Sequence, residues 1–334
     1  MSPPIVTYPL LSARRSFAAA IPALLALATF SGPVRAQEPP PPAKPKPAPY
    51  SLPFQLRPVV AGSVVRSDTA FAFYENPVSE ESGTTIASTL LASYKLTEEL
   101  APLVRVGVVS NSPPEGPMGV TADSGFGFLN PVLGATYALK PAPDLRLAFF
   151  LGLTVPIGSG GGDDPDAGQA IARSGPGIYS RSALDNAMFA VNDFTVFPGI
   201  DFAYVAHGLT AQIEATVLQL TRVRGEDAPA PFGAVDSSRT NFTGGIHVGY
   251  FFIPALSAAV ELRHQRWLST PVAIENDATD TLRDTTTVAF GPRFHFEIAE
   301  KKWLRPALAL VLPLDDPMQD ADYKIVQLDV PFAF

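Results

Sequence analysis

From residue 54 onward, apolar side chains alternate with polar or small ones in segments of about 10 to 15 residues. In one such segment, Leu209, Ala211 and Ile213 are interleaved with Thr210 and Gln212. A period of two places successive side chains on opposite faces of a β-strand, so the two faces of each strand meet different surroundings. The pattern predicts twelve strands, over residues 54–74, 85–96, 101–111, 126–139, 145–157, 192–205, 209–223, 240–252, 256–269, 282–298, 303–313 and 323–334.

The connections between the predicted strands alternate between short and long without exception. The short ones are residues 97–100, 140–144, 206–208, 253–255 and 299–302. The long ones lie near residues 75–84, 112–125, 158–191, 224–239, 270–281 and 314–322. Short periplasmic turns and long extracellular loops alternate in this way in outer-membrane barrels, which have an even number of strands. We therefore predict an all-β fold, a transmembrane antiparallel up-and-down β-barrel of about twelve strands with both termini on the periplasmic side. A soluble β-sandwich is the alternative, because it shares the apolar/polar alternation but does not require the parity of the loops.

Several prolines fall inside the predicted strands, where each removes one hydrogen-bond donor from the ladder: Pro58, Pro198, Pro292, Pro306 and Pro331. A closed barrel has no free edge at which to place them. We expect bulges, strand ends or local distortions at these positions, and deviations of the strand boundaries beside them.

The first residues have the pattern of a secretory signal peptide, over residues 1–36. Arg14 and Arg15 precede the apolar run Phe17–Phe30, and small residues lead to a predicted cleavage before Gln37. A membrane anchor is the alternative, but the apolar run is short for a span. Residues 37–53 are rich in proline, which favours a stiff, extended periplasmic linker, with a ligand for a partner domain as the alternative. The barrel is then predicted over residues 54–334, in the cell outer membrane.

Composition excludes several classes of protein. The 334 residues include no cysteine, which excludes a disulfide scaffold, a thiolate zinc site and a lipoprotein anchored through cysteine. Without the leader, 21 basic residues face 32 acidic ones, so we predict no nucleic-acid partner. Charged residues make up only 17% of the chain, yet no apolar run outside the leader approaches the roughly 18 residues of a membrane helix. The predicted partners are therefore outer-membrane lipid, the barrel-insertion machinery and a small-molecule solute.

Aromatic side chains gather near the predicted periplasmic ends of the strands. They include Tyr94, Tyr137, Tyr204, Tyr250, Phe252 and Trp303. Such residues form girdles at the membrane interfaces of barrels, whereas in a soluble protein they would belong to the core. Their position beside short turns favours a membrane girdle.

The final strand alternates from Val330 and ends in phenylalanine, with Phe332 and Phe334 on one face. This ending resembles the C-terminal signature by which outer-membrane proteins are recognised for barrel insertion. The resemblance implies that Phe332 and Phe334 form an insertion signal read by the barrel-insertion machinery.

Residues 124–162 resemble a hairpin of the outer-membrane barrel family named for the meta-pathway of phenol degradation. In that family a glycine-rich strand start precedes Tyr-x-Leu, and the next strand ends in Val-Pro-x-Gly. The corresponding residues here are Tyr137, Leu139, Val155, Pro156 and Gly158. The family's usual Gly-Asp is replaced by Phe128, Leu129 and Asn130, and the match covers about 40 residues. The resemblance implies a channel or uptake role for small, often aromatic compounds, and it carries no site residues.

Charged side chains on the predicted inward faces lie at similar heights in the barrel. They are Arg105, Asp201, Glu214, His247, Glu261, Arg263, Arg293, Arg305 and Asp329. Because a twelve-stranded barrel has a narrow lumen, we predict that they form a lumen constriction that selects solutes by charge and size, together with loop 158–191. The alternative is a salt-bridged plug that only holds the wall together. Adjacent strands would then pair Glu261 and Arg263 with Arg293, and Arg305 with Asp329.

No catalytic residue, cofactor or metal site is predicted. None of the four histidines is followed two residues later by serine, as in a twelve-stranded phospholipase family, and the elbow, zinc and phosphate-loop motifs are missing. A hydrolase assembled from distant residues, such as His264 with an acid at the outer rim, is the alternative. The acidic outer loops are expected to be solvated, with divalent-cation bridging as the alternative. The segment from Asp164 through Asp166 to Gly168 is similar to part of a calcium loop but lacks its terminal glutamate.

These patterns together predict a non-enzymatic, porin-like barrel. Its expected function is a narrow channel for passive diffusion or uptake of small solutes, apolar or aromatic ones among them. The alternative is a structural or adhesive barrel whose loops bind a partner. An outer-membrane hydrolase is the third hypothesis.

Overall fold

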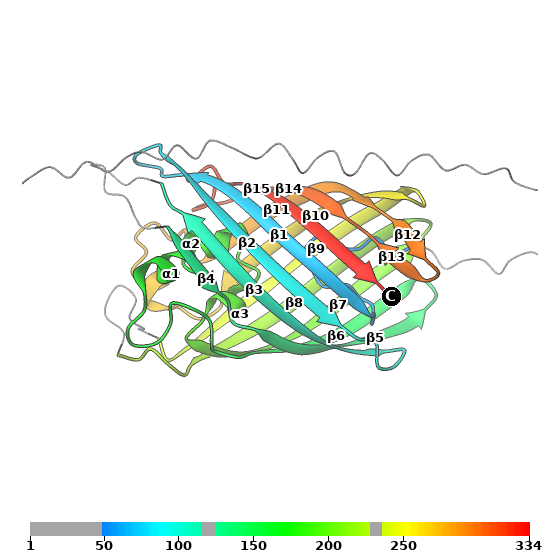
Figure 1. Ribbon diagram of the computed structural model, residues 1–334, viewed down its shortest axis with the longest axis horizontal. Coiled ribbons are helices and arrows are strands. Elements are labelled where there is room, and N and C mark those ends of the chain that lie inside the picture. The colour runs from blue at the N-terminus through cyan, green and yellow to red at the C-terminus, as the bar shows by residue number, and fades with distance from the viewer. Residues whose placement is uncertain (1–48, 115–123, 228–235) are drawn as a thin grey trace, which may run out of the picture. The chain divides into compact units, whose positions relative to one another are not determined.

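The computed structural model describes residues 49–114, 124–227 and 236–334, so the predicted signal peptide and most of the predicted linker lie outside the described residues. Fifteen β-segments form one antiparallel sheet, in which β1 pairs with β15 and so closes the ring (Figure 1). Three pairs of segments, β4 with β5, β11 with β12 and β13 with β14, each follow the path of a single interrupted strand. The fold is therefore a closed barrel of 12 antiparallel strands, as predicted.

The strand boundaries follow the alternation of the sequence closely. The segments are β1 (Val64–Glu75), β2 (Ser82–Ser93), β3 (Leu100–Ser112), β4 (Gly125–Phe128), β5 (Val132–Ala142), β6 (Leu145–Thr154), β7 (Asp193–Ala206), β8 (Leu209–Arg222), β9 (Ser238–Ile253), β10 (Leu256–Trp267), β11 (Asp284–Phe294), β12 (Phe296–Ala299), β13 (Lys302–Leu304), β14 (Ala307–Pro313) and β15 (Lys324–Ala333). From β3 onward, long loops and short turns alternate as predicted, but the first two connections, residues 76–81 and 94–99, are equal in length. The prediction for the first strand is wrong at its start, since β1 begins at Val64 and residues 54–63 are not in the sheet.

Two of the five prolines interrupt the ladder locally, as expected, whereas Pro331 lies inside β15 and pairs with Arg66 of β1 in unbroken register. Pro198 is paired with Leu151 of β6, but residues 197 and 198 have no partner on β8. Pro292 is paired with Ala258, while residues 291 and 292 have no partner on β14. Pro306 lies between β13 and β14, and Pro58 lies outside the sheet. The wall absorbs each missing donor without opening the ring.

The two faces of the wall differ sharply in polarity. Large apolar side chains of the strands point outward and are exposed, among them Val65, Phe73, Ile86, Leu90, Val104, Leu133, Phe149, Leu151, Ile200, Phe202, Ile213, Val217, Ile246, Val248, Val260, Phe290, Leu308, Leu310 and Leu328. Polar and charged side chains point inward and are buried, among them Asp68, Thr89, Gln212, His247, Glu261, Arg263, Gln327 and Asp329. An apolar outer face around a polar interior requires hydrocarbon outside. In a closed sheet the backbone groups of every strand find hydrogen-bond partners on neighbouring strands, as hydrocarbon requires. The chain is an outer-membrane β-barrel, and the sandwich alternative is excluded.

The predicted aromatic girdle lies on the outer face near the short turns. Tyr94, Tyr137, Tyr204, Tyr250 and Phe252 are all exposed. Aromatic rings with a polar tip are favourable at the level of the lipid headgroups. In outer-membrane barrels the short turns lie at the periplasmic interface and the long loops lie outside.

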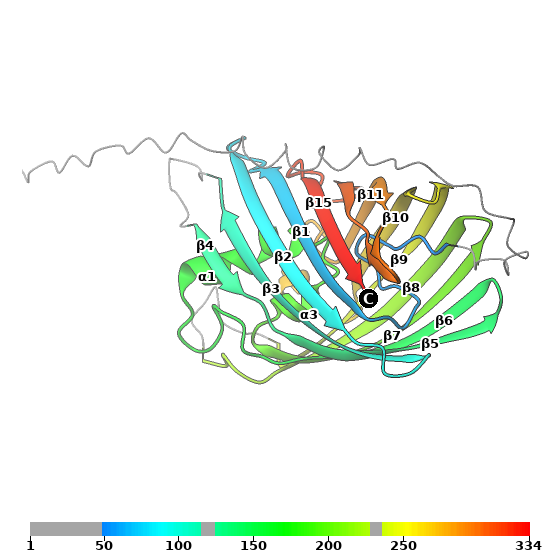
Figure 2. The same ribbon diagram turned by 45° about the vertical axis from the view of Figure 1, so that its right-hand side comes forward.

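The helices all belong to the long loops. They are α1 (Ala167–Ala172), α2 (Gly175–Ser180), α3 (Asn186–Phe189) and α4 (Val272–Glu275). None of the helices in the described part of the chain is long and apolar enough to cross a membrane. The first three gather at the end of the barrel with the long loops, opposite the C-terminus (Figure 1). The segment before β1, at the blue end of the colour scale, runs inside the ring of strands (Figure 2).

Candidate functional site in the barrel lumen

Two stretches of chain occupy the lumen. The first is residues 49–62, here called the re-entrant segment, which lie between the described N-terminal end and β1. The second is residues 155–192 between β6 and β7, here called the plug loop, which contains α1 to α3. The side chains of the predicted constriction contact these two stretches.

The re-entrant segment is held mainly through its backbone. The amide N–H of Phe54 donates to Glu261 Oε2 at 2.8 Å, and that of Gln55 donates to Glu261 Oε1 at 3.1 Å. The carbonyl of Pro53 accepts from Arg293 at 3.0 Å, and that of Phe54 accepts from Gln327 at 3.0 Å. The backbone N–H and C=O groups of a buried segment without secondary structure need hydrogen-bond partners, and here side chains of the wall supply them.

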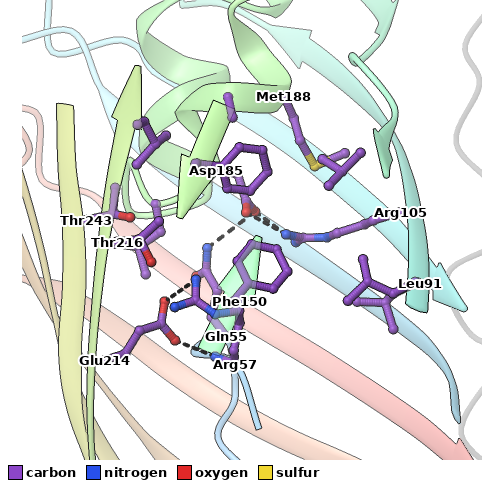
Figure 3. Close-up of a pocket in the computed structure, with 16 residues that line it drawn as sticks. Gln55, Arg57, Leu91, Arg105, Phe150, Asp185, Met188, Glu214, Thr216 and Thr243 are labelled. Atoms are coloured by element: carbon purple, nitrogen blue, oxygen red, sulfur yellow. Dashed lines mark hydrogen bonds and ion pairs between the residues drawn. The ribbon is translucent and has the colours of Figure 1, made fainter. Parts of the chain in front are cut away.

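Arg57 attaches the same segment to the opposite wall. Its guanidinium is 3.1 Å from Asp201 Oδ1 and 3.1 Å from Glu214 Oε1, and it lies 4.5 Å from the centroid of the Phe150 ring. Figure 3 shows Arg57 beside Glu214 and Phe150. A guanidinium between two carboxylates balances charges that would otherwise repel each other in a buried site.

The plug loop is held through charged side chains. Arg181, just after α2, is fully buried and pairs with Asp68 of β1 at 2.7 Å and with Asp185 at 2.9 Å. Arg105 of β3 also pairs with Asp185, at 2.6 Å. Burial alone would raise the pKa of Asp185, but Arg105 and Arg181 hold that pKa below its usual range. The loop therefore contributes both an acid and a base to one buried network.

A break in the wall fixes the base of the plug loop. Between β4 and β5 the chain turns inward at Leu129 and Asn130, both fully buried, before Pro131. The Asn130 side chain donates to the carbonyl of Ala190 at 2.8 Å and accepts from the amide of Gly158 at 2.9 Å. One amide side chain therefore binds both ends of the plug loop.

The two inserted stretches meet at the middle of the lumen. The Gln55 side chain donates to the carbonyl of Arg181 at 2.8 Å and lies 3.4 Å from Asp185 Oδ2. Gln55, Asp185 and Arg105 lie around the same space in Figure 3. The Gln55 side chain therefore joins the two stretches by hydrogen bonds.

The structure places all the predicted constriction residues on the inner face, with partners that differ in part from those predicted. Asp201 and Glu214 pair with Arg57, Arg105 with Asp185, and Arg263 with Glu261 at 2.7 Å. His247 lies 3.7 Å from Glu261. Asp329 pairs with Arg293 and Arg66, each at 2.6 Å.

Two predicted ion pairs are wrong within the described chain. Arg305 makes no ion pair with Asp329; its guanidinium lies 5.4 Å from the Trp303 ring centroid. Glu261 pairs with Arg263 of its own strand and not with Arg293. The inserted stretches compete for these side chains, and adjacency in the wall does not decide the pairing.

Two cavities remain beside β2 and β3. The upper cavity, of about 90 Å³, lies in the middle of the lumen and includes Phe150, Met188 and Phe197 in its lining. The lower cavity, of about 150 Å³, lies at the periplasmic end and includes Leu52, Val60 and Ala101. Both are lined by Arg57, Leu91 and Leu103. They follow one another along the same side of the lumen.

No protein-family model matches this chain, and no curated protein matches it. Solved structures do match. An outer membrane channel from Pseudomonas putida F1, described as COG4313, is 16% identical with a TM-score of 0.49, over 84% of this chain and 98% of that one. The NanC porin is 8% identical with a TM-score of 0.44, over 80% and 98%. The beta domain of the Bordetella autotransporter BrkA is 9% identical with a TM-score of 0.43, over 82% and 99%. These likenesses concern the barrel fold alone.

The hydrolase hypothesis centred on His264, and the structure places this side chain near the outer rim. It contacts Thr286 at 3.0 Å and lies 3.7 Å from Asp284. A different contact joins Ser257 and His295 at 2.9 Å, with both residues buried. Neither of these two residues lines the cavities beside β2 and β3. A serine beside a histidine requires access for a substrate before it can act as a nucleophile.

The acidic loops form no cluster of metal ligands in the described part of the chain. Asp166, the middle residue of the calcium-like segment, accepts from the amide of Gln169 at 2.9 Å and so caps α1. This is the ordinary role of aspartate at a helix N-terminus.

Sequence reasoning missed several residues that hold the inserted stretches, among them Arg57, Arg66, Asp68, Arg181 and Asp185. Asp68 lies on the inward alternation of the first strand, at the register of Asp329, so the pattern could have found it. Arg57 was assigned to a strand. Arg181 and Asp185 lie in a loop without periodicity, where nothing in the sequence indicates that a side chain enters the lumen.

Proposed function

We propose that this barrel is a narrow channel for passive diffusion or uptake of small solutes with an apolar or aromatic body. The observation that carries the proposal is the succession of the two cavities beside β2 and β3, which share Leu91, Leu103 and Arg57. The ion pairs of Glu261, Arg263 and Arg293 lie on the β10 and β11 side, across the ring. The cavities combine apolar side chains with charged ones at their border, among them Arg105, Asp185 and Glu214 in the upper cavity and Arg66 and Asp329 in the lower one.

The size of the lower cavity suits a single ring. The lower cavity measures about 150 Å³, and an engineered apolar cavity of about 150 Å³ takes up benzene. The resemblance of residues 124–162 to the phenol meta-pathway barrel family agrees with such solutes. Together these points support aromatic compounds as the solute class.

In this proposal the constriction residues act through the inserted stretches. Arg105, Asp201 and Glu214 hold the plug loop and the re-entrant segment in place at rest. When either stretch moves, these charged side chains line the widened aperture and determine which solutes pass, as rings of charged side chains do in pores. No energy source is required, because a solute gradient drives diffusion.

A matched pair of variants tests the role of the two cavities. Leu103→Trp fills the space shared by both cavities, whereas Leu133→Trp places the same side chain on the exposed outer face of the neighbouring strand. Uptake of benzyl alcohol, benzoate and glucose is measured with vesicles that carry lipopolysaccharide in their outer leaflet. We expect benzyl alcohol to enter faster than into empty vesicles, and Leu103→Trp alone to slow it severalfold. The proposal fails if none of the three enters faster than into empty vesicles.

The filled lumen favours a second candidate, a structural or adhesive barrel whose loops bind a partner. Arg181, Arg263 and Arg293 are each nearly inaccessible, so the inserted stretches rest on fully buried charges. A barrel of this second kind would stay silent in planar bilayers, both as wild type and after either stretch is released by mutation. Discrete conductance steps in a released variant would support the channel.

We also propose that the last residues direct assembly. Phe332 and Phe334 stack at 5.8 Å between ring centroids, and Phe334 is exposed on the outer face. A surface of this kind is available to the barrel-insertion machinery before lipid covers it. Truncation of Phe334 should lower the amount of folded barrel in the outer membrane, measured by heat-modifiable mobility, while unassisted folding in detergent is unchanged.

A further inference from the structure

Arginine side chains gather at the extracellular mouth, above the plug loop. Arg222 ends β8, Arg239 lies at the start of β9, and Arg173 lies between α1 and α2. These three line a cavity of about 510 Å³, and Arg224 stands beside it. We call Arg173, Arg222, Arg224 and Arg239 the mouth arginines.

The charge of the mouth arginines is only partly balanced by the described chain, in which Glu226 and Asp236 attract Arg222 without forming an ion pair with it. Asp193 forms an ion pair with Arg239 and lies 3.8 Å from Arg222, and no other carboxylate of the described residues pairs with any of the four. Arg173 and Arg224 donate to backbone carbonyls of the plug loop. Within ion-pair distance, one carboxylate therefore faces several cations.

Arg222 is the member with the least satisfied side chain. Only 11% of the side chain is exposed, yet its Nε and Nη1 atoms are buried without a hydrogen-bond partner. A buried guanidinium without an acceptor is costly, and an anion that accepts from it removes that cost. Burial, and to a lesser extent the neighbouring Arg224, lower the pKa of Arg173 to about 10.

The shape of the cavity indicates which anion fits. Among the other lining residues, Ile171 and Ala273 offer apolar surface, while Ser174, Asn192 and Asp193 are polar. Arg222 and Arg239 stand on the inward alternation of their strands, so a lipid headgroup outside the wall does not reach them. An occupant must therefore come from solution and bring an apolar body together with its charge.

We propose that the mouth arginines form a binding site for small organic carboxylates, with the carboxylate at Arg222 and the apolar body against Ile171 and Ala273. A guanidinium presents two parallel N–H groups that match a carboxylate. The site goes beyond the proposed channel function, since binding at the mouth does not depend on passage through the lumen. A channel that conducts nothing would still bind the anion here.

The test is isothermal titration calorimetry of the full chain folded in detergent, at constant ionic strength. Benzoate is the probe, benzyl alcohol is its uncharged counterpart, and inorganic phosphate is an anion without an apolar body. We expect saturable binding of benzoate at one site, weaker binding of phosphate, and none of benzyl alcohol. Binding in detergent without added lipid also separates a solute site from a lipid site.

Variants locate the site. Arg222→Gln should weaken benzoate about tenfold, as expected for the loss of a charged hydrogen-bond donor. Arg222→Lys keeps the positive charge but lacks the two parallel N–H groups of the guanidinium, so it should recover only part of the affinity. Arg266→Gln is the matched control, because Arg266 stands at the same rim but is half exposed and paired with Asp284. Heat-modifiable mobility verifies that each variant is folded.

Three results would overturn the assignment. They are the lack of saturable benzoate binding by the wild type, equal weakening by Arg222→Gln and Arg266→Gln, and binding of benzyl alcohol or phosphate as tight as that of benzoate. The uptake experiments with Leu103→Trp are independent of all three. A failed channel and a failed anion site are therefore distinguishable.

Discussion

The two stretches that fill the lumen are held by different chemistry. The re-entrant segment presents backbone N–H and C=O groups, and the wall supplies the charges through Glu261 and Arg293. The plug loop supplies charges of its own, Arg181 and Asp185, which meet Asp68 and Arg105 of the wall. The re-entrant segment is therefore held by wall charges on its backbone and by one cation of its own, Arg57, whereas the plug loop contributes both an acid and a base to its network.

This difference determines which substitutions release which stretch. Removal of a wall charge such as Glu261 deprives several backbone amides of their acceptor but leaves the plug loop its own pairs. Removal of Arg181 leaves Asp68 without its ion pair and leaves Asp185 with Arg105 alone, but the re-entrant segment keeps its acceptors. Because the chain contains no cysteine, single cysteines at Ser51 and at Ala187, both buried, report on the two stretches separately.

The largest effect is expected for Arg181→Gln. The substitution leaves Asp68 with a hydrogen bond from Gln327 but no cation from the plug loop. An uncompensated buried carboxylate should lower the free energy of unfolding by about 3–5 kcal/mol. Urea titration in lipid vesicles measures this loss, and thiol labelling should increase at Ala187→Cys while Ser51→Cys stays protected.

A double variant serves as the control for Arg181→Gln. Asp68→Asn, added to Arg181→Gln, removes the carboxylate that has lost its ion pair and should restore part of the lost stability. A single variant within about 1 kcal/mol of the wild type, the range of exposed pairs, would contradict the role given to Arg181.

The next effect is expected for Glu261→Gln, which removes a wall carboxylate that holds the re-entrant segment. Its carboxylate accepts from Phe54, Gln55 and Arg263, and the amide would turn a donor toward them. The loss of these charged hydrogen bonds should cost about 2–3 kcal/mol of unfolding free energy. Labelling should now increase at Ser51→Cys and remain low at Ala187→Cys. Equal exposure of both cysteines in both variants would mean that the two stretches move as one body.

The wall of this barrel was predictable from the sequence because its physics is periodic. Hydrocarbon outside and polar groups inside impose an alternation that fixed which side of the wall residues such as Glu261 and Ile213 occupy, and loop parity fixed the direction of each strand. The contents of the lumen were not predictable in this way. Phe54 and Leu56 continue the apolar alternation of β1, because an extended segment inside the lumen also has two faces in different surroundings. The pattern therefore does not distinguish this segment from a strand of the wall.

The pairing of charged side chains was harder to predict than the contents of the lumen. Neighbouring strands suggested Arg305 with Asp329, yet Asp329 is taken by Arg66 and Arg293, which also bind carbonyls of the re-entrant segment. The cation that pairs with Asp329 depends on the re-entrant segment, whose position the sequence pattern does not predict. The same holds for Arg181, whose sequence neighbours resemble those of any solvated loop.

Acid should release the plug loop in a narrow range. The pKa of Asp185 is held below its usual range by Arg105 and Arg181 against the opposing effect of burial, so the ionised group stabilises the fold at neutral pH. That contribution is complete above the ordinary aspartate pKa of about 3.9 and is lost as the pH falls through the lowered native value. Labelling of Ala187→Cys, with acid-tolerant thiol reagents, should stay low at pH 5 and rise below about pH 4. Asp185→Asn should flatten this profile, and an unchanged profile would assign the acid response to another group.

The smallest effect is expected for Arg266→Gln at the outer rim. Arg266 is 2.9 Å from Asp284, the same distance that separates Arg181 from Asp185, but Arg266 and Asp284 are partly exposed. Water and salt screen an exposed pair, so its loss should change the unfolding free energy by less than about 1 kcal/mol and leave both cysteines protected. If this rim pair proved as costly to break as the buried one, distance and not burial would govern these ion pairs. The contrast between the plug loop and the re-entrant segment would then have a different cause.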